Sequence, residues 1–188
     1  MTPTIIILGG LAAIAIYVAF VFNDLIQSKN RVKEASSDVD VQLKRRYDLI
    51  PNLVETVKGY MNHERETLVK LTEARTAAMA AGNDPKATLA EREKIENQLS
   101  ATLKTIFAVS ENYPDLKASN NFLQLQDEIS DTENKIMASR RFYNGNVRDF
   151  NTKIQMFPNN LFAGLLKFHA FEFFTAAESE KQNVQVKF

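Results

Sequence analysis

An uncharged apolar run near the N-terminus, Ile5 to Phe22, constrains the chain most. A helix of this length, rising about 1.5 Å per residue, nearly crosses the hydrocarbon layer of a bilayer, which is about 30 Å thick. A cleaved signal peptide would need basic residues before the run, but Met1 to Thr4 carries no Lys or Arg. A buried helix of a soluble protein is disfavoured because the run is apolar on every face. The sequence therefore predicts a retained transmembrane anchor over residues 1–23.

Basic residues are distributed unevenly about this run, which predicts the orientation of the anchor. None precedes it, whereas Lys29, Arg31, Lys33 and the triplet 44–46 follow it closely. The cytosolic flanks of membrane spans carry the excess of Lys and Arg. We therefore expect the N-terminus outside and the C-terminal body in the cytosol.

The rest of the chain has the composition of a folded helical body. With 45% apolar and 24% charged residues among 188, it can form one domain with a core. Lys+Arg and Asp+Glu both number 23 and are interspersed, so no basic face is available for a nucleic acid. The absence of cysteine excludes disulfides, thiolate metal sites and cysteine nucleophiles. The 6 Gly and 5 Pro are too few for a β-sandwich or a Gly-rich nucleotide fold, so the predicted fold class is all-α.

Apolar residues spaced by three and four positions predict one very long amphipathic helix behind the anchor. The helix should end between Ala81 and Pro85, because Gly82 can adopt the left-handed C-terminal conformation and Pro85 cannot continue a helix. Pro51 lies inside it and predicts a kink, since Pro lacks the N–H that would bond to the Tyr47 carbonyl. We expect a bent, continuous helix rather than a hairpin at Pro51. The apolar seam consists of Leu25, Val32, Ala35, Val39, Leu43, Ile50, Leu53, Val57, Tyr60, Leu68, Leu71 and Ala78.

Three further helices are predicted. The second has an apolar stripe from Leu89 to Val109 and ends before Pro114, because the residue before a proline avoids the helical conformation. The third runs from near Leu116 to Phe157, and a shorter, Phe-rich helix capped by Asn159 or Asn160 follows to about Glu178. The seam of the third helix consists of Phe122, Leu125, Ile129, Thr132, Ile136, Ser139, Tyr143, Val147, Phe150, Ile154 and Phe157. These elements divide the chain into an anchor (1–23), a helical domain (24–178) and a C-terminal tail (179–188).

Four charged residues, Arg46, Glu64, Arg75 and Glu96, fall in or beside positions of the apolar seams. Desolvating a charge without a partner costs several kcal/mol, so each must pair or reach water. Two interpretations stay open. The pairs fix the register of the helices, or the charges line a polar groove that binds a ligand.

The two histidines do not complete a metal or catalytic motif. A di-iron helical bundle needs Glu three residues before each His, but Tyr60 and Leu166 occupy those positions before His63 and His169. The His-Glu pair at residue 63 begins like a zinc-protease motif, yet no second His follows at the required spacing. We interpret His63 as a polar surface residue and His169 as a member of an aromatic helix. No catalytic residue, metal ligand or cofactor is predicted, and the chain is not expected to be an enzyme.

Phenylalanines concentrate between Phe157 and Phe174, a segment that holds nearly half of the 13 in the chain. One interpretation is a helix that caps the end of the helical body. The other is an interfacial helix that lies on the bilayer or on a neighbouring copy, favoured by the aromatics but opposed by Lys167 as its one strong cation. Lipid contact is thus expected through residues 5–22 and stays open for the Phe-rich segment.

Two blocks of sequence resemble a known family. Residues 40–60, DVQLKRRYDLIPNLVETVKGY, with His-Glu shortly after, closely resemble the hallmark motif of the LemA family. Residues 132–136 (TENKI) and 140–144 (RRFYN), with Asn151 and Phe157-Pro158, resemble its second block. The resemblance implies a bacterial inner-membrane protein with one transmembrane helix, a short N-terminus outside and a cytosolic antiparallel four-helix bundle. A magnetosome-formation protein is similar to this family, which implies a role in membrane organisation and names no reaction.

Two functional hypotheses follow. In the first, the protein is a single-pass membrane scaffold, and the first helix outreaches the second, so that its leftover seam associates with identical bundles as a coiled-coil homo-oligomer. In the second, it is a membrane-tethered sensor or adaptor whose polar groove binds a small ligand or a regulatory protein.

Overall fold

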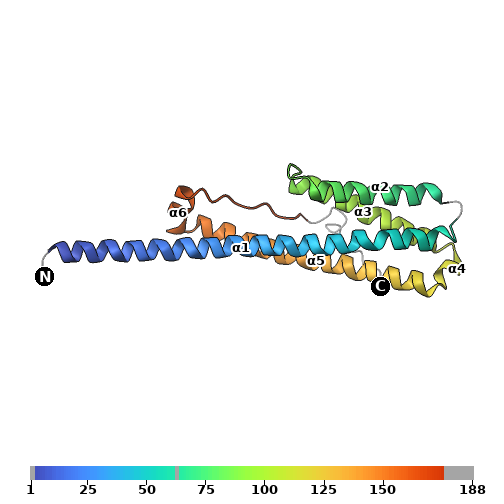
Figure 1. The fold of residues 1–188 in the computed structure, drawn as a ribbon, viewed down its shortest axis with the longest axis horizontal. Helices are drawn as coiled ribbons and strands as arrows, with labels where there is room; N and C mark the ends of the chain where they lie inside the picture. The colour runs from blue at the N-terminus through green and yellow to red at the C-terminus, as the bar shows by residue number, and fades with distance from the viewer. Residues whose placement is uncertain (1–2, 62–63, 176–188) are drawn as a thin grey trace, which may run out of the picture. The chain divides into compact units, whose positions relative to one another are not determined.

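The computed structural model of the chain describes residues 3–61 and 64–175. Within these residues the regular secondary structure is entirely helical, as the composition predicted (Figure 1). The six helices are α1 (Pro3–Lys58), α2 (Arg65–Asn83), α3 (Leu89–Ser110), α4 (Pro114–Lys117), α5 (Asn120–Gln155) and α6 (Asn159–Leu165). His63 and the predicted tail 179–188 lie outside the described residues.

The described residues divide into two compact units, and α1 and α5 contribute to both. The anchor unit contains residues 3–38 and 139–173. The core unit contains residues 39–61, 64–138 and 174–175. The domain boundaries after residues 23 and 178, the four-helix-bundle arrangement and the kink at Pro51 stay predictions.

α1 begins with the apolar run that the sequence marked as a membrane anchor. Among the described residues it is the one helix long and apolar enough to cross a membrane, and 6% of its most apolar stretch is buried inside the structure. A core helix of a soluble protein would be covered by other elements. The exposure of this run therefore disfavours the alternative of a buried soluble helix.

The apolar seams of α1 and α5 are buried as their spacing predicted. In α1, the apolar side chains that are at most 1% exposed are Leu25, Val32, Ala35, Val39, Ile50, Leu53 and Val57. In α5, the buried seam positions are Phe122, Ile129, Thr132, Ile136, Tyr143, Val147 and Phe150. Two predicted seam positions are exceptions: Tyr60 follows the end of α1 and is 42% exposed, and Phe157 follows the end of α5 and is 78% exposed.

The first helix ends earlier than predicted. α1 passes through Pro51 and stops at Lys58, and the amides of Tyr60 and Met61 both donate to the Val57 carbonyl at 3.0 Å. Gly59 follows Lys58 and has a low helix propensity, and Met61 packs into the core while Tyr60 is exposed. The prediction of one continuous helix to residue 81 is wrong, and so is the leftover seam inferred from its length.

The core unit is built on one hydrophobic cluster to which five helices contribute. α2 and α3 lie side by side in it (Figure 1). Removing this apolar surface from water stabilises the unit by roughly 25 cal/mol per Å². The cluster consists of Tyr47, Ile50, Leu53, Val57, Met61, Leu68, Leu71, Ala74, Ala78, Leu99, Leu103, Ile106, Leu116, Phe122 and Ile129.

The C-terminus of α2 and the N-terminus of α3 lie close to the predicted positions, although α2 does not end for the predicted reason. α2 stops at Asn83, but no described glycine has a positive φ, so Gly82 does not end the helix by a left-handed turn. α3 begins with a capping box, in which the Glu91 amide donates to Thr88 Oγ1 at 3.2 Å and the Thr88 amide donates to Glu91 Oε2 at 2.8 Å.

α6 is shorter than the predicted Phe-rich helix. It ends at Leu165 rather than near Glu178, and residues 168–175 form no helix. The helix is closed by the Phe168 amide, which donates to the Ala163 carbonyl at 2.9 Å, while Lys167 takes the left-handed conformation with φ 55°. Asn159 begins the helix, yet no side chain caps it, so the predicted Asn cap is wrong as well.

Candidate functional site

The most concentrated polar contacts of the core unit surround Arg46, which α1 places between α3 and α5. Its Nη1 donates to Glu133 Oε2 at 2.5 Å and to Ser100 Oγ at 2.9 Å, and its Nη2 donates to Glu96. The Tyr47 hydroxyl donates to the second oxygen of Glu96, and Ser100 Oγ donates to Glu133 Oε1 at 3.0 Å. We call these five residues the Arg46 cluster.

The two carboxylates of the Arg46 cluster differ in how deeply they are buried. The side chain of Glu96 is 6% exposed and that of Arg46 is 1% exposed, whereas that of Glu133 is 34% exposed. Glu96 therefore depends on its protein partners, while Glu133 also meets water. Burial raises the pKa of the Tyr47 hydroxyl, and the nearby Glu96 carboxylate raises it further. Tyr47 thus stays a neutral hydrogen-bond donor to Glu96.

The structure brings together two of the four seam charges predicted from the sequence. Arg46 and Glu96 pair directly, and Arg75 of α2 lies nearby, with its Nε donating to the Tyr47 carbonyl at 2.7 Å. Glu64 is the N-cap residue of α2, and it is not among the hydrogen-bonding partners of Arg46.

Three members of the Arg46 cluster were not predicted from the sequence. Glu133 follows the seam residue Thr132 directly, and Tyr47 follows Arg46, so both lie at the edge of an apolar stripe. Ser100 adjoins the buried Leu99 in the same way. Polar residues next to a seam are the signal that could have found them, because helix edges bring such positions close to a neighbouring helix.

The chemistry available to the Arg46 cluster is that of a structural ion pair. The guanidinium donates to three different acceptors, and the cluster links α1 to α3 and to α5. A buried, hydrogen-bonded pair of this kind holds helices in one register, since a shifted register would leave a charge unpaired. This geometry favours the first interpretation of the seam charges, in which they fix the register.

A small groove adjoins the Arg46 cluster between α3 and α5. Ser100 and Glu133 line its polar side, and Leu103, Phe107 and Ile129 line its apolar side. Its volume of about 240 Å³ is below the roughly 300–1,000 Å³ of most small-molecule sites.

The described residues contain no group of three or more His, Cys, Asp or Glu side chains that could hold a metal ion. His169 is exposed and lies beyond the end of α6, so its predicted place in an aromatic helix is wrong. His63 lies outside the described residues.

In the anchor unit, the segment after α6 is fastened to α5 by polar and aromatic contacts. Asn151 Nδ2 donates to the Phe171 carbonyl at 2.9 Å, and its Oδ1 accepts from the Phe171 amide at 3.0 Å. The rings of Phe168 and Phe171 meet the Phe150 ring at centroid distances of 6.2 and 5.3 Å. The Tyr143 hydroxyl donates to the Glu172 carbonyl at 3.1 Å, and burial raises its pKa.

A second polar group of the anchor unit lies just past the apolar run. Lys153 Nζ donates to Asp24 Oδ1 at 2.8 Å and to Ser28 Oγ at 2.7 Å. Lys29 Nζ lies 5.5 Å from the centre of the Phe168 ring. Asp24 is the first charged residue after the run, so its charge is paired where the chain leaves the apolar stretch.

Comparison with known proteins adds two findings. A family model described as the LemA family matches residues 35–188. The chain is also similar to Protein LemA of Metamycoplasma hominis, with 34% identity over 162 residues, which cover 86% of this chain and 72% of that protein. The name of this relative indicates no catalytic activity.

Proposed function

Because the chain belongs to the LemA family, we propose that it is a single-pass protein of the bacterial cytoplasmic membrane that acts as a self-associating helical scaffold. It would organise the membrane or partners bound to it. In this proposal residues 5–22 cross the bilayer, the N-terminus lies outside, and the body is a cytosolic antiparallel four-helix bundle whose first helix bends near Pro51.

One observation carries the membrane part of the proposal: α1 is a single helix from Pro3 to Lys58. Its N-terminal part is exposed and apolar, and its C-terminal part supplies Ile50, Leu53 and Val57 to the hydrophobic core. An exposed apolar run of this length has no stable place in water. The helix that would cross the membrane is therefore the same helix that supplies core residues to the body.

The self-association part is supported by a strip of α1 in the core unit. Val41 is 61% exposed there. Lys44, Arg45 and Asp48 lie beside it around a shallow hollow, together with Leu49. A strip that carries apolar side chains and charges of both signs can pair with itself across a two-fold axis. This strip replaces the leftover seam, which the early end of α1 removes.

The absence of cysteine from the chain allows a direct test of self-association. A single Val41→Cys substitution in the full-length protein, reconstituted in lipid vesicles and mildly oxidised, should give a disulfide-linked dimer. Val69→Cys on α2, 54% exposed, is the matched control and should stay monomeric. If both variants stay monomeric, and amine crosslinkers in several mild detergents also give only monomers, the scaffold proposal is refuted.

The groove between α3 and α5 supports a second candidate, a membrane-tethered sensor or adaptor. Its polar side, Ser100 and Glu133, belongs to the Arg46 cluster, so an occupant would act on the contact between α1 and α5. Ser130→Trp at the groove should block it. A low-molecular-weight extract of host cells should then raise the Tm of the wild type and not that of the variant, and equal shifts would contradict this function.

A further inference from the structure

Apolar side chains beside the anchor remain exposed in the anchor unit. They belong to residues 156–166, which follow the end of α5 and include all of α6, and which we call the α6 segment. Its exposed members are Met156 (58%), Phe157 (78%), Leu161 (63%), Leu165 (78%) and Leu166 (40%). In contrast, Ala163 is buried and the Phe162 ring contacts Tyr17 of α1. One side of the α6 segment thus packs on α1, and the other presents large apolar side chains.

Three contacts define the level of the α6 segment along α1. Before the segment, Lys153 pairs with Asp24, just past the apolar run. Within it, the Phe162 ring lies 6.5 Å from the Tyr17 ring, inside the run. After it, Phe168 lies against Lys29, again past the run. The chain therefore reaches the level of the apolar run between residues 153 and 168.

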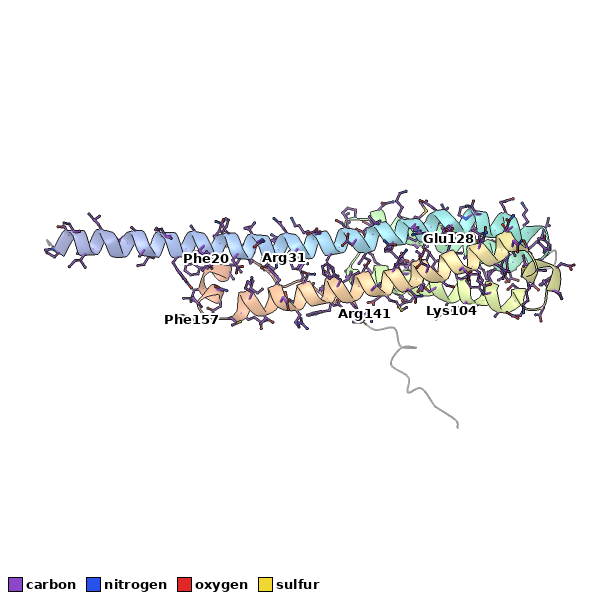
Figure 2. All side chains as sticks on the ribbon, turned by 90° about the horizontal axis from the view of Figure 1, so that it is seen from below. Phe20, Arg31, Lys104, Glu128, Arg141 and Phe157 are labelled. Atoms are coloured by element: carbon purple, nitrogen blue, oxygen red, sulfur yellow. The ribbon has the colours of Figure 1, made fainter. Side chains whose placement is uncertain are left out.

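Figures 1 and 2 show the α6 segment at the same position along α1 as these contacts. In Figure 1 α6 lies beside the N-terminal half of α1, and in Figure 2 Phe157 lies at about the level of Phe20 along α1. Arg141 lies much farther along α5 from this level (Figure 2).

The position of the α6 segment along α1 determines how deep the segment would lie in the bilayer. Tyr17 precedes Phe22, the last residue of the run, by five positions, or about 7.5 Å along the helix. The contact between Tyr17 and Phe162 therefore places α6 about 5–10 Å inside the boundary of the run. Interfacial amphipathic helices bury their apolar faces to about this depth.

From this geometry we infer that the α6 segment is a second membrane contact, which inserts its exposed apolar face into the leaflet at the C-terminal end of the anchor. The inference rests on the proposed anchoring through residues 5–22. Its occupant is the bilayer rather than a second copy, because the apolar face lies beside α1 at the level of Phe20, an exposed residue of the run that the same lipids must cover. Two later phenylalanines, Phe168 and Phe171, pack on Phe150 instead.

The backbone of Lys167 supports this assignment independently. Lys167 adopts a φ of 55°, a conformation that glycine takes at much lower cost at the end of a helix. The lysine at this position instead places an exposed cation directly after the apolar face of the α6 segment. A lysine at that position can reach the anionic headgroups of the bilayer surface.

The absence of tryptophan from the chain makes the inference testable by fluorescence. Single Phe157→Trp and Leu161→Trp variants of the full-length protein are reconstituted in phosphatidylcholine and phosphatidylglycerol vesicles. Some of the vesicles contain lipid brominated near the top or near the middle of the acyl chains. Phe20→Trp reports on the anchor, and Phe142→Trp is the matched control, since Phe142 is 59% exposed on α5 in the same unit.

We expect the emission of Phe157→Trp and Leu161→Trp to shift to the blue relative to Phe142→Trp. Bromine near the top of the chains should quench it more strongly than bromine near the middle. If the emission and quenching of Phe157→Trp and Leu161→Trp equal those of Phe142→Trp while Phe20→Trp is quenched, the α6 segment does not insert, and the proposed anchor is unaffected. If Phe20→Trp is also unquenched, the anchoring proposal fails and this inference fails with it. A blue shift that bromine does not quench and that disappears on dilution with lipid would assign the face to a second copy and overturn the inference.

Discussion

Replacing Arg46 with methionine should reveal how strongly the buried ion pair holds the core unit. Methionine keeps the length of the aliphatic stem, so the change removes the charge and three hydrogen bonds without opening a large cavity. Glu96, which is 4% exposed as a residue, would keep only the Tyr47 hydroxyl as a partner. Glu133 would lose less, because its side chain is 34% exposed and Ser100 still donates to it.

The expected loss follows from this difference in burial. Removing one partner of a buried ion pair destabilises a protein by about 3–5 kcal/mol, mainly through the unpaired charge that remains. Arg46→Met should therefore lower the free energy of unfolding by about that amount. In the double variant Arg46→Met/Glu96→Met both charges are absent, so its loss should be at least about 2 kcal/mol smaller than the sum of the two single losses.

The assay is urea unfolding of the full-length protein in detergent, followed by circular dichroism. Lys44→Met is the control, because it breaks the pair with Asp48, whose two side chains are 77% and 59% exposed, and should change the free energy of unfolding by less than about 0.5 kcal/mol. A loss below about 1 kcal/mol for Arg46→Met, or strict additivity in the double variant, would show that the Arg46 cluster does not hold the helices.

Three further changes test individual contacts. Asn151→Ala removes both hydrogen bonds to the Phe171 backbone, and we expect a loss of about 1–2 kcal/mol and faster hydrogen exchange of the Phe171 amide. Lys167→Gly should raise the free energy of unfolding in detergent by about 0.5–1 kcal/mol, because glycine adopts a positive φ readily. Because the folded state raises the pKa of Tyr47 above the ordinary 10.0, unfolding releases its proton above that pH and stability should fall as pH rises. Tyr47→Phe should reduce this alkaline slope of the urea midpoint.

Each of these changes has a matched comparison. Asn146→Ala removes one exposed hydrogen bond to the Phe142 carbonyl within α5 and should have little effect. Lys167→Ala keeps the backbone strain and should give no gain in stability. The pKa of Tyr143 is also raised by burial, so a weaker fall of stability with rising pH should persist in Tyr47→Phe. If the pH dependence of the urea midpoint is unchanged in Tyr47→Phe, the assignment to Tyr47 is contradicted.

The break after Lys58 shows where periodicity misled the sequence analysis. Leu68 and Leu71 continue the spacing of the α1 seam and are buried, but they belong to α2. Two helices joined by a short loop can carry the same apolar period, because both must turn one face toward a shared core. The period predicts which side chains are buried and does not predict whether the helix is continuous.

The composition of the Phe-rich segment likewise did not predict which of its phenylalanines are buried. Its composition predicted apolar contacts, and both bilayer contact and internal packing were left open. The structure divides the segment: Phe157 is exposed near α1, whereas Phe168 and Phe171 pack on Phe150. Asn151, a residue twenty positions away, pairs with the Phe171 backbone in place of a further helical turn.

The amino-acid sequence by itself determined the helical class, the apolar run and the buried faces of α1 and α5, because each depends on hydrophobicity and spacing within one segment. It also determined that Arg46 and Glu96 require partners, since a buried charge must be paired. Only the tertiary structure decided that Glu133, Ser100 and Tyr47 complete the cluster, that α1 ends at Lys58 and that α6 ends at Leu165. These features depend on contacts between residues far apart in the chain, and their free energies outweigh the local preferences that a sequence pattern records.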